Sequence, residues 1–228
     1  MKRLLVVFLL VGCTASPASS QPSLPAAKSA AATVAATAAA TATPKPTPTP
    51  EPSPVVLSGK GDFVSDPVKL TFVANLTLTH AGARNFIVYE NQGTAKNLLV
   101  NTIGLYQGTR PLWADGQTLD GPRTFEIKAD GAWTLTMSPI KCCATEGAFA
   151  GHGDAVSTSI TSTDTSSKPW EISHTGTRNF IVYLRCDTGA NLVVNKIGAY
   201  SGSALVALSK GFCIWDVRAD GDWSIKPR

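Results

Sequence analysis

Residues 80–108 read HAGARNFIVYENQGTAKNLLVNTIGLYQG, and residues 174–202 read HTGTRNFIVYLRCDTGANLVVNKIGAYSG. Aligned without a gap, the two stretches are identical at 17 of 29 positions. An internal repeat of this fidelity indicates that each copy is one folding unit. The repeat therefore determines the architecture, although no motif within it specifies a reaction.

Apolar and polar residues alternate along much of the chain after residue 55. Residues 70–78 and 124–128 alternate in this way in the first copy, and residues 215–218 do so in the second. A period of two is typical of strands with one buried face, and turns rich in Gly, Asn and Asp separate the runs. The sequence predicts an all-β fold with two tandem antiparallel β-sandwich domains of immunoglobulin or jelly-roll type, which follow a disordered tether.

The N-terminus has the features of an export signal. Lys2 and Arg3 precede the apolar run 4–11, which has the length of a secretory signal and is too short to span a bilayer. The run ends in Leu-Val-Gly-Cys, with the cysteine at position 13, and this ending resembles the lipobox of bacterial lipoproteins.

The lipobox resemblance implies that the signal peptide, residues 1–12, is removed and that Cys13 carries a diacylglycerol. It implies a protein anchored by lipid in a bacterial cell membrane and facing outside the cytoplasm, so that its first partner is the membrane itself. The alternative is an ordinary signal peptide that is cut near Ala15 or Ala18, in which case Cys13 has no role.

A tether follows the cysteine. Residues 13–54 are mostly Ala, Thr, Ser and Pro, with too few large aliphatic side chains to form a core. Every second residue from Pro44 to Pro54 is proline, which favours an extended polyproline II conformation. We expect a disordered linker over 13–54, a first β-sandwich over 55–139 and a second over 140–228.

Four cysteines remain after Cys13, and an even number outside the cytoplasm favours disulfides. Cys186 is expected at the end of one strand and Cys213 at the start of another, and such ends face each other in an antiparallel pair. We favour Cys186–Cys213, which leaves Cys142 and Cys143 free or joined to each other; the alternative joins each of them to one of the other two. No CxxC pair is present, so we predict no metal site and no cofactor.

The charge of the chain suggests no particular partner. The whole chain has a net charge of +4, and loss of Lys2 and Arg3 leaves 4 − 2 = +2. Each copy carries as many basic as acidic residues, which argues against nucleic acid as a ligand.

The repeated phrase His-x-Gly-x-Arg-Asn supplies one set of candidate ligand contacts, namely Arg84 and Asn85 in the first copy and Arg178 and Asn179 in the second. Duplicated polar pockets would increase avidity. The alternative is a structural turn, in which the histidine contacts a backbone carbonyl and the asparagine satisfies loop backbone groups.

A difference between the copies supplies the other candidates. Residues 109–121 are four residues longer than the matching 203–211 and place Trp113 outside the strand pattern, next to Arg110 and Asp115. A tryptophan in a loop is a typical exposed contact for carbohydrate or protein. Alternatively, the ring covers an open end of the sandwich.

No pattern of a catalytic site is present: the sequence lacks a Gly-x-Ser-x-Gly elbow, a His-Glu-x-x-His helix and a phosphate-binding glycine loop. We therefore predict no catalytic residues and no enzyme activity. Residues 55–228 resemble, in the style of their pattern, small β-rich modules of exported bacterial proteins, including carbohydrate-binding and pre-peptidase C-terminal types.

That resemblance implies binding without identifying the ligand. We expect a non-enzymatic, membrane-anchored surface lipoprotein whose paired modules bind an extracellular carbohydrate or protein. The alternative is a structural or assembly component of a cell-envelope complex.

Overall fold

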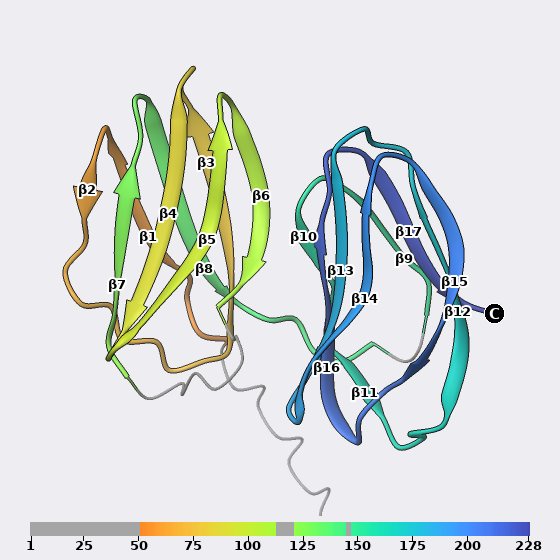
Figure 1. Ribbon diagram of the computed structural model, residues 1–228. Helices are drawn as coiled ribbons and strands as arrows, with labels where there is room; N and C mark the ends of the chain where they lie inside the picture. Colours follow the sequence, from red (N-terminus) through yellow and green to blue (C-terminus); the bar gives the residue numbers. More distant parts are fainter. Residues whose placement is uncertain (1–50, 113–120, 145–146) are drawn as a thin grey trace, which may run out of the picture. The chain divides into compact units, whose positions relative to one another are not determined.

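The computed structural model describes residues 51–112, 121–144 and 147–228 of the chain. These residues belong to one compact unit, Pro48–Arg228, and form the strands drawn in Figure 1. Among them, no helix is long and apolar enough to cross a membrane. The expected signal peptide, Cys13 and most of the expected linker lie outside the described residues, as do Trp113 and Asp115.

Eight strands, β1 to β8, make up what we call the first repeat. They are β1 (Val55–Lys60), β2 (Phe63–Val64), β3 (Ala74–Ala81), β4 (Asn85–Gln92), β5 (Ala95–Ile103), β6 (Tyr106–Pro111), β7 (Arg123–Lys128) and β8 (Ala132–Pro139). They form two four-stranded antiparallel sheets, in the orders β1-β8-β3-β6 and β2-β7-β4-β5.

Nine strands, β9 to β17, make up the second repeat. They are β9 (Phe149–His152), β10 (Ala155–Val156), β11 (Ile160–Ser162), β12 (Ser167–His174), β13 (Asn179–Cys186), β14 (Gly189–Ile197), β15 (Tyr200–Ala207), β16 (Gly211–Arg218) and β17 (Asp222–Pro227). One sheet has the order β15-β12-β17-β9; the other has the order β10-β16-β13-β14, with β11 also paired to β16.

The two repeats share one topology, because each strand of the first has a counterpart at the same place in a sheet of the second. They also share an irregularity: the register shifts after Val88 in β4 and after Val182 in β13. Strand β11 is extra, and an isolated bridge between Val68 and Arg123 occupies its place in the first repeat. The predicted pair of antiparallel β-sandwiches is confirmed.

Each repeat encloses its own hydrophobic core. The core of the first includes Leu76, Leu78 and Phe86, and that of the second includes Ile172 and Phe180, all of them essentially inaccessible to solvent. Full burial of one such side chain contributes about 1.5–3 kcal/mol. The four described tryptophans are buried: Trp133, Trp170, Trp215 and Trp223.

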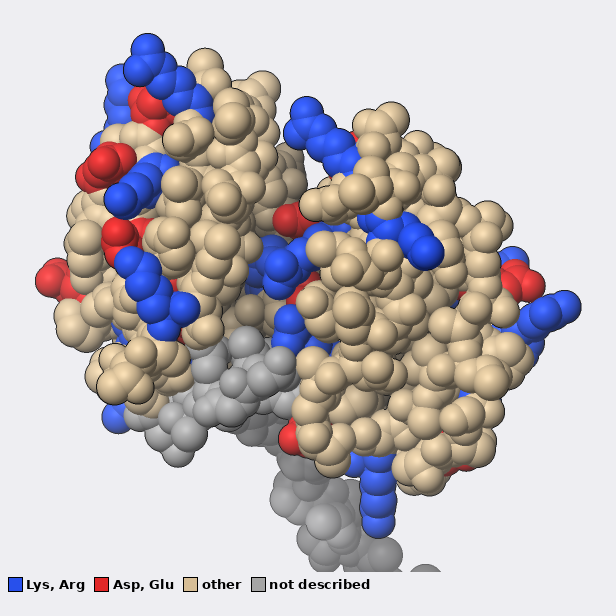
Figure 2. Space-filling view, viewed as in Figure 1, with Lys and Arg blue, Asp and Glu red and all other residues tan. Residues whose placement is uncertain are grey.

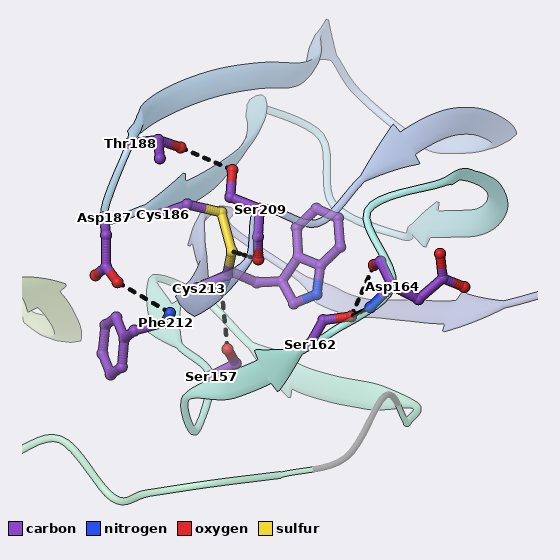
Figure 3. The surroundings of a disulfide bond; sticks show 10 residues. Ser157, Ser162, Asp164, Cys186, Asp187, Thr188, Ser209, Phe212 and Cys213 are labelled. Atoms are coloured by element: carbon purple, nitrogen blue, oxygen red, sulfur yellow. Dashed lines mark hydrogen bonds between the residues drawn. A yellow bond between two sulfur atoms is a disulfide. The ribbon is translucent and has the colours of Figure 1, made fainter.

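A disulfide joins β13 to β16 in the second repeat. Cys186 and Cys213 are direct partners in the antiparallel register and are bonded to each other, which confirms the favoured pairing (Figure 3). Cys186 is the last residue of β13, because pairing with β16 continues to this residue. Because Cys186 and Cys213 are joined to each other, the alternative that pairs each of them with Cys142 or Cys143 is wrong.

At the matching place in the first repeat, the register pairs Gln92 with Arg123. The Arg123 guanidinium is buried, and its Nη1 donates to Glu90 Oε1 at 2.7 Å and to the carbonyl of Leu112 at 3.0 Å. A buried ion pair thus occupies the part of the first sandwich that corresponds to the disulfide of the second.

Candidate functional site

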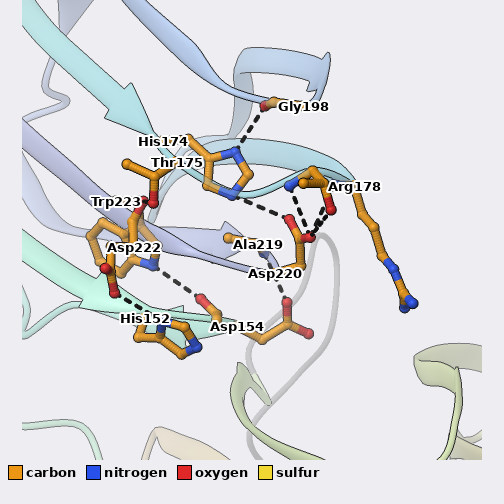
Figure 4. Close-up of polar contacts among 12 residues, drawn as sticks. His152, Asp154, His174, Thr175, Arg178, Gly198, Ala219, Asp220, Asp222 and Trp223 are labelled. Carbon is orange, nitrogen blue, oxygen red and sulfur yellow. Dashed lines mark hydrogen bonds and ion pairs between the residues drawn. The ribbon is translucent and has the colours of Figure 1, made fainter.

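The repeated His-x-Gly-x-Arg-Asn phrase forms a hydrogen-bonded turn. In the second repeat, His174 Nδ1 lies 3.0 Å from the carbonyl oxygen of Gly198, and its Nε2 lies 3.4 Å from Asp220 Oδ1 (Figure 4). Asp220 Oδ2 accepts hydrogen bonds from the backbone N–H groups of Thr177 and Arg178, both at 3.0 Å. The aspartate thereby ties the turn to the loop between β16 and β17.

The first repeat contains the same turn. His80 Nδ1 lies 2.7 Å from the carbonyl oxygen of Gly104 and Nε2 lies 3.3 Å from Asp130 Oδ1. Asp130 Oδ2 accepts hydrogen bonds from the backbone N–H groups of Ala83, at 3.0 Å, and Arg84, at 3.1 Å. The histidine does contact a backbone carbonyl, as its structural interpretation predicted.

Hydrogen bonds from the turn lower the pKa of both aspartates, Asp130 and Asp220. The backbone N–H of Ala83 is the main cause that lowers the pKa of Asp130 below its usual value. At Asp220, burial raises the pKa, but the N–H groups of Thr177 and Arg178 outweigh it, so that the pKa is again lowered. Both carboxyl groups therefore serve as ionised acceptors that hold the turns.

The glycine of the phrase is required by space. A Cβ atom at Gly82 would overlap the side chains of Asp130 and His80, and one at Gly176 would overlap those of Asp220 and His174. The shared residues of the phrase therefore build the turn, and their repetition in the sequence reflects folding.

The arginine and asparagine side chains of the phrase are left exposed by this turn. Figure 4 shows the Arg178 side chain extending away from the hydrogen-bonded cluster. Arg178 and Asn179 line a cavity of about 590 Å³, which we call the larger cavity. Arg84 and Asn85 do not line it. Arg178 and Asn179 therefore differ from their sequence counterparts Arg84 and Asn85 in facing a cavity.

The larger cavity is formed by strands of both repeats. One side comes from β5 and the start of β6, and the other from the turn after β9, from β13 and from the end of β16. Asn101 of β5 and Arg178 face the same space, so polar side chains from the two copies of the repeat meet there.

Hydrogen bonds join the repeats beside this cavity. Tyr106 Oη donates to Asp154 Oδ2 at 2.8 Å, and the backbone N–H of Thr109 donates to the carbonyl of Asp154 at 2.9 Å. Burial and the adjacent Asp154 carboxylate raise the pKa of Tyr106 far above its usual range. The second repeat therefore supplies a charged acceptor for this hydroxyl, which makes the hydrogen bond a strong one.

Arg110, a candidate for an exposed contact, is only 2% exposed. Strand β6 continues to Pro111, so Arg110 belongs to the strand and not to the loop beyond it. Its Nη1 donates to Asp216 Oδ1 at 3.0 Å, while Arg185 Nε donates to Asp216 Oδ2 at 2.9 Å. Arg110 is therefore a buried link between the repeats, and the expectation of a loop contact is corrected.

A smaller cavity of about 290 Å³ adjoins this ion pair. Arg110, Arg185 and Arg218 line it, together with Lys96 and the apolar residues Leu98 and Leu99. Arg218 and the two leucines also line the larger cavity, so the two spaces share a wall. Figure 2 shows Lys and Arg atoms, with acidic atoms beside them, in a hollow of the surface.

Three charged residues at this site were missed by sequence reasoning, namely Arg185, Asp216 and Arg218. The aligned copies give a signal for Arg185, which matches Asn91. They give none for the other two, because Arg218 matches the basic Lys128 and Asp216 matches the acidic Glu126.

Within residues 51–112, 121–144 and 147–228, no group of three or more His, Cys, Asp and Glu side chains is arranged to hold a metal ion.

Comparison with known proteins gives no family for this chain. No protein-family model matches the sequence, and no curated protein matches it. Among solved structures, the stem and receptor binding domain of the spike protein P1 from bacteriophage PM2 aligns over 80% of this chain and 81% of its own, with 8% identity and a TM-score of 0.17.

Proposed function

We propose that this protein is a non-enzymatic surface lipoprotein that is anchored in a bacterial membrane through Cys13 and binds an extracellular ligand with its paired β-sandwiches. The single observation that carries the binding proposal is the larger cavity, which is lined by polar side chains from both repeats, including Arg178 and Asn179. Ligand sites in proteins are typically concave and few. A carbohydrate fits a cavity of this polar character, and an exposed protein segment is the other candidate.

The anchor proposal rests on the charge, apolar run and Leu-Val-Gly-Cys ending of the first thirteen residues. Intact-mass analysis of protein extracted from membranes tests it. Acyl chains on Cys13, together with loss of residues 1–12, would support the anchor; an unacylated chain recovered from the cytosol would overturn it.

The binding proposal is tested on a glycan array with the whole protein and two matched variants, Arg178→Ala and Arg84→Ala. Both arginines are exposed, and both donate a backbone N–H to an aspartate in equivalent turns, but only Arg178 lines the larger cavity. Glycan binding that is lost in Arg178→Ala and kept in Arg84→Ala would support the cavity as the site. Equal behaviour of the variants would contradict it.

An assembly role is the second candidate, and exposed aliphatic side chains favour it. Ile103 is 72% exposed and Ile197 is 80% exposed, at equivalent strand ends in the two repeats. Aliphatic side chains repeated at such positions are suited to contact another protein. Absence of binding to every glycan, combined with an envelope protein crosslinked at Ile103 or Ile197, would favour assembly over carbohydrate recognition.

A further inference from the structure

We propose that the smaller cavity binds the oxyanion of an acidic sugar (a carboxylate, sulfate or phosphate group) and that Arg218 is its main contact. This inference deepens the proposed function and rests on it, because it names the chemical class of the ligand at the wall that the two cavities share. It is carried by charge balance, by unsatisfied donors and by a difference between the repeats.

The charges around the smaller cavity do not balance. Three arginines line it, and the nearby carboxylate of Asp216 is already occupied, since Arg110 takes one oxygen and Arg185 takes the other. Lys96, the remaining basic residue, is paired with Glu126 at 2.5 Å. Arg218 forms no ion pair among the described residues, and Asp216, the acidic group that attracts it, is already paired with two other arginines, so positive charge is left for a ligand.

Unsatisfied hydrogen-bond donors accompany this excess charge. The Nε atoms of Arg110 and Arg218 are both buried, and neither has a hydrogen-bond partner in the part of the chain that the structure describes. Buried donors without partners are costly. Burial, followed by the repulsion of Arg110, lowers the pKa of Arg218 below the ordinary arginine value although Asp216 and Tyr183 oppose this shift. An oxyanion in the cavity would relieve both the repulsion and the unmet donors.

An aromatic ring holds the arginines at the cavity. The guanidinium carbon of Arg185 lies 4.9 Å from the centroid of the Tyr183 ring, and that of Arg218 lies 5.7 Å from it. Contact with the ring restricts the guanidinium groups, whose planar forks match carboxylate, sulfate and phosphate oxygens. On the opposite wall, Leu98 and Leu99 offer apolar surface that suits the C–H face of a sugar ring.

The described residues of the first repeat form no equivalent site. Asn91 and Lys128 stand where the second repeat has Arg185 and Arg218, and Ala204 stands where the first has Arg110. One chain therefore has one anion site, and Lys128→Gln is a matched control for Arg218→Gln because each removes one cation at the same place in its own repeat.

Isothermal titration calorimetry of the whole protein in detergent tests the proposal. The probes are glucuronate, glucose 6-sulfate and glucose 6-phosphate, with neutral glucose and inorganic sulfate as comparisons. We expect at least one acidic sugar to bind with one site per chain, more tightly than glucose or inorganic sulfate, and less tightly as salt is added. Arg218→Gln should weaken binding by at least about tenfold, and Lys128→Gln by less than about twofold.

Arg218→Lys keeps the charge without the planar fork, so an intermediate affinity is expected for it. Circular dichroism and the thermal unfolding midpoint of each variant show whether it is folded. Equal effects of Arg218→Gln and Lys128→Gln, or equal binding of acidic and neutral sugars, would overturn the proposal. If inorganic sulfate binds as tightly as the sugars, the acidic sugar is the wrong ligand.

Different results would overturn the anion site and the proposed function. Neutral glycans that bind the array in an Arg178-dependent manner, without any acidic sugar binding in the calorimeter, would leave the proposed function standing and overturn only the anion site. If no glycan binds in either assay, carbohydrate recognition at the larger cavity and the anion site are overturned together.

Discussion

The two repeats secure the same part of the same sandwich by different chemistry. In the second, the register partners Cys186 and Cys213 form a disulfide between β13 and β16. In the first, the corresponding partners are Gln92 and Arg123, and the Arg123 guanidinium forms a fully buried ion pair with Glu90. The fold therefore requires a link at this place but not a particular kind of link.

The difference has energetic consequences. The disulfide constrains the unfolded chain, so its contribution survives changes of salt and depends on the redox state. The ion pair depends on both partners being present, because each charge is buried and removal of one leaves the opposite charge without it. Leu184, an apolar residue, stands in the second repeat where Glu90 stands in the first, since Cys213 takes the place of Arg123 there.

The largest expected effect comes from breaking the ion pair. Glu90→Leu copies the residue of the second repeat but leaves the Arg123 charge buried without its carboxylate, and we expect a loss of about 3–5 kcal/mol in the free energy of unfolding. Urea unfolding of the whole protein measures it. The triple variant Glu90→Leu, Gln92→Cys, Arg123→Cys, which transplants the disulfide, should recover most of the loss; a loss below about 1 kcal/mol in the single variant would contradict the comparison.

Removing the disulfide should have the next largest effect. The cysteines are 27 residues apart in sequence. Releasing a loop of about this length costs about 3–4 kcal/mol in chain entropy. We expect the double variant Cys186→Ala/Cys213→Ala to have its unfolding midpoint at a correspondingly lower urea concentration. Tryptophan fluorescence follows the unfolding. Reducing agent should destabilise the wild type but not the double variant, and equal sensitivity of the two would refute the assignment.

A smaller effect is expected from removing the hydroxyl of Tyr106, which bonds Asp154 of the other repeat. Tyr106→Phe removes the hydrogen bond to the Asp154 carboxylate, at a cost of about 1.5–3 kcal/mol. Tyr200 is its counterpart, and no hydrogen bond of its hydroxyl is seen within the described residues. Tyr200→Phe should therefore leave the unfolding midpoint nearly unchanged, and a cost equal to that of Tyr106→Phe would show that the contact between the repeats contributes nothing.

The smallest effect concerns a feature that the repeats share. The pKa values of Asp130 and Asp220 are lowered in the folded protein, so their stabilising effect is present above the unfolded value of about 3.9 and is lost as the pH falls through the lowered value. Asp130→Asn and Asp220→Asn should lower the melting temperature at pH 7 to similar extents, and by less at pH 3. Effects that differ strongly between the two variants would contradict the equivalence of the turns.

Those features that depend on local pattern were predictable from the sequence. The alternation of residues 70–78 places Leu76 and Leu78 in the core, and the ends of neighbouring strands bring Cys186 to Cys213. The position of the turn at His174 and Gly176 follows from the repeated phrase, although its acceptors, the Gly198 carbonyl and the Asp220 carboxylate, come from distant parts of the repeat. Such features need only the period of a strand and the space available to a glycine.

Contacts between the repeats were not predictable in the same way. Arg110 and Asp216 are 106 residues apart, and neither the alternation along β6 nor that along β16 indicates that one faces the other. Arg110 was placed in a loop because residues 109–121 are four longer than the matching 203–211, yet β6 continues to Pro111. Comparison of the copies offered a signal for Arg110, which matches Ala204, but none for Asp216, which matches Glu126.

The alanine at position 204 has a consequence for higher-order association. A head-to-tail contact between unlike surfaces propagates into a filament whenever the free end offers the same surface again. Here the far end of the tandem offers Tyr200 but, at position 204, no cation with which to meet an aspartate such as Asp216 of another molecule. We therefore expect that the contact that joins the repeats does not extend from one molecule to the next, because the ion pair to Asp216 has no counterpart at Ala204.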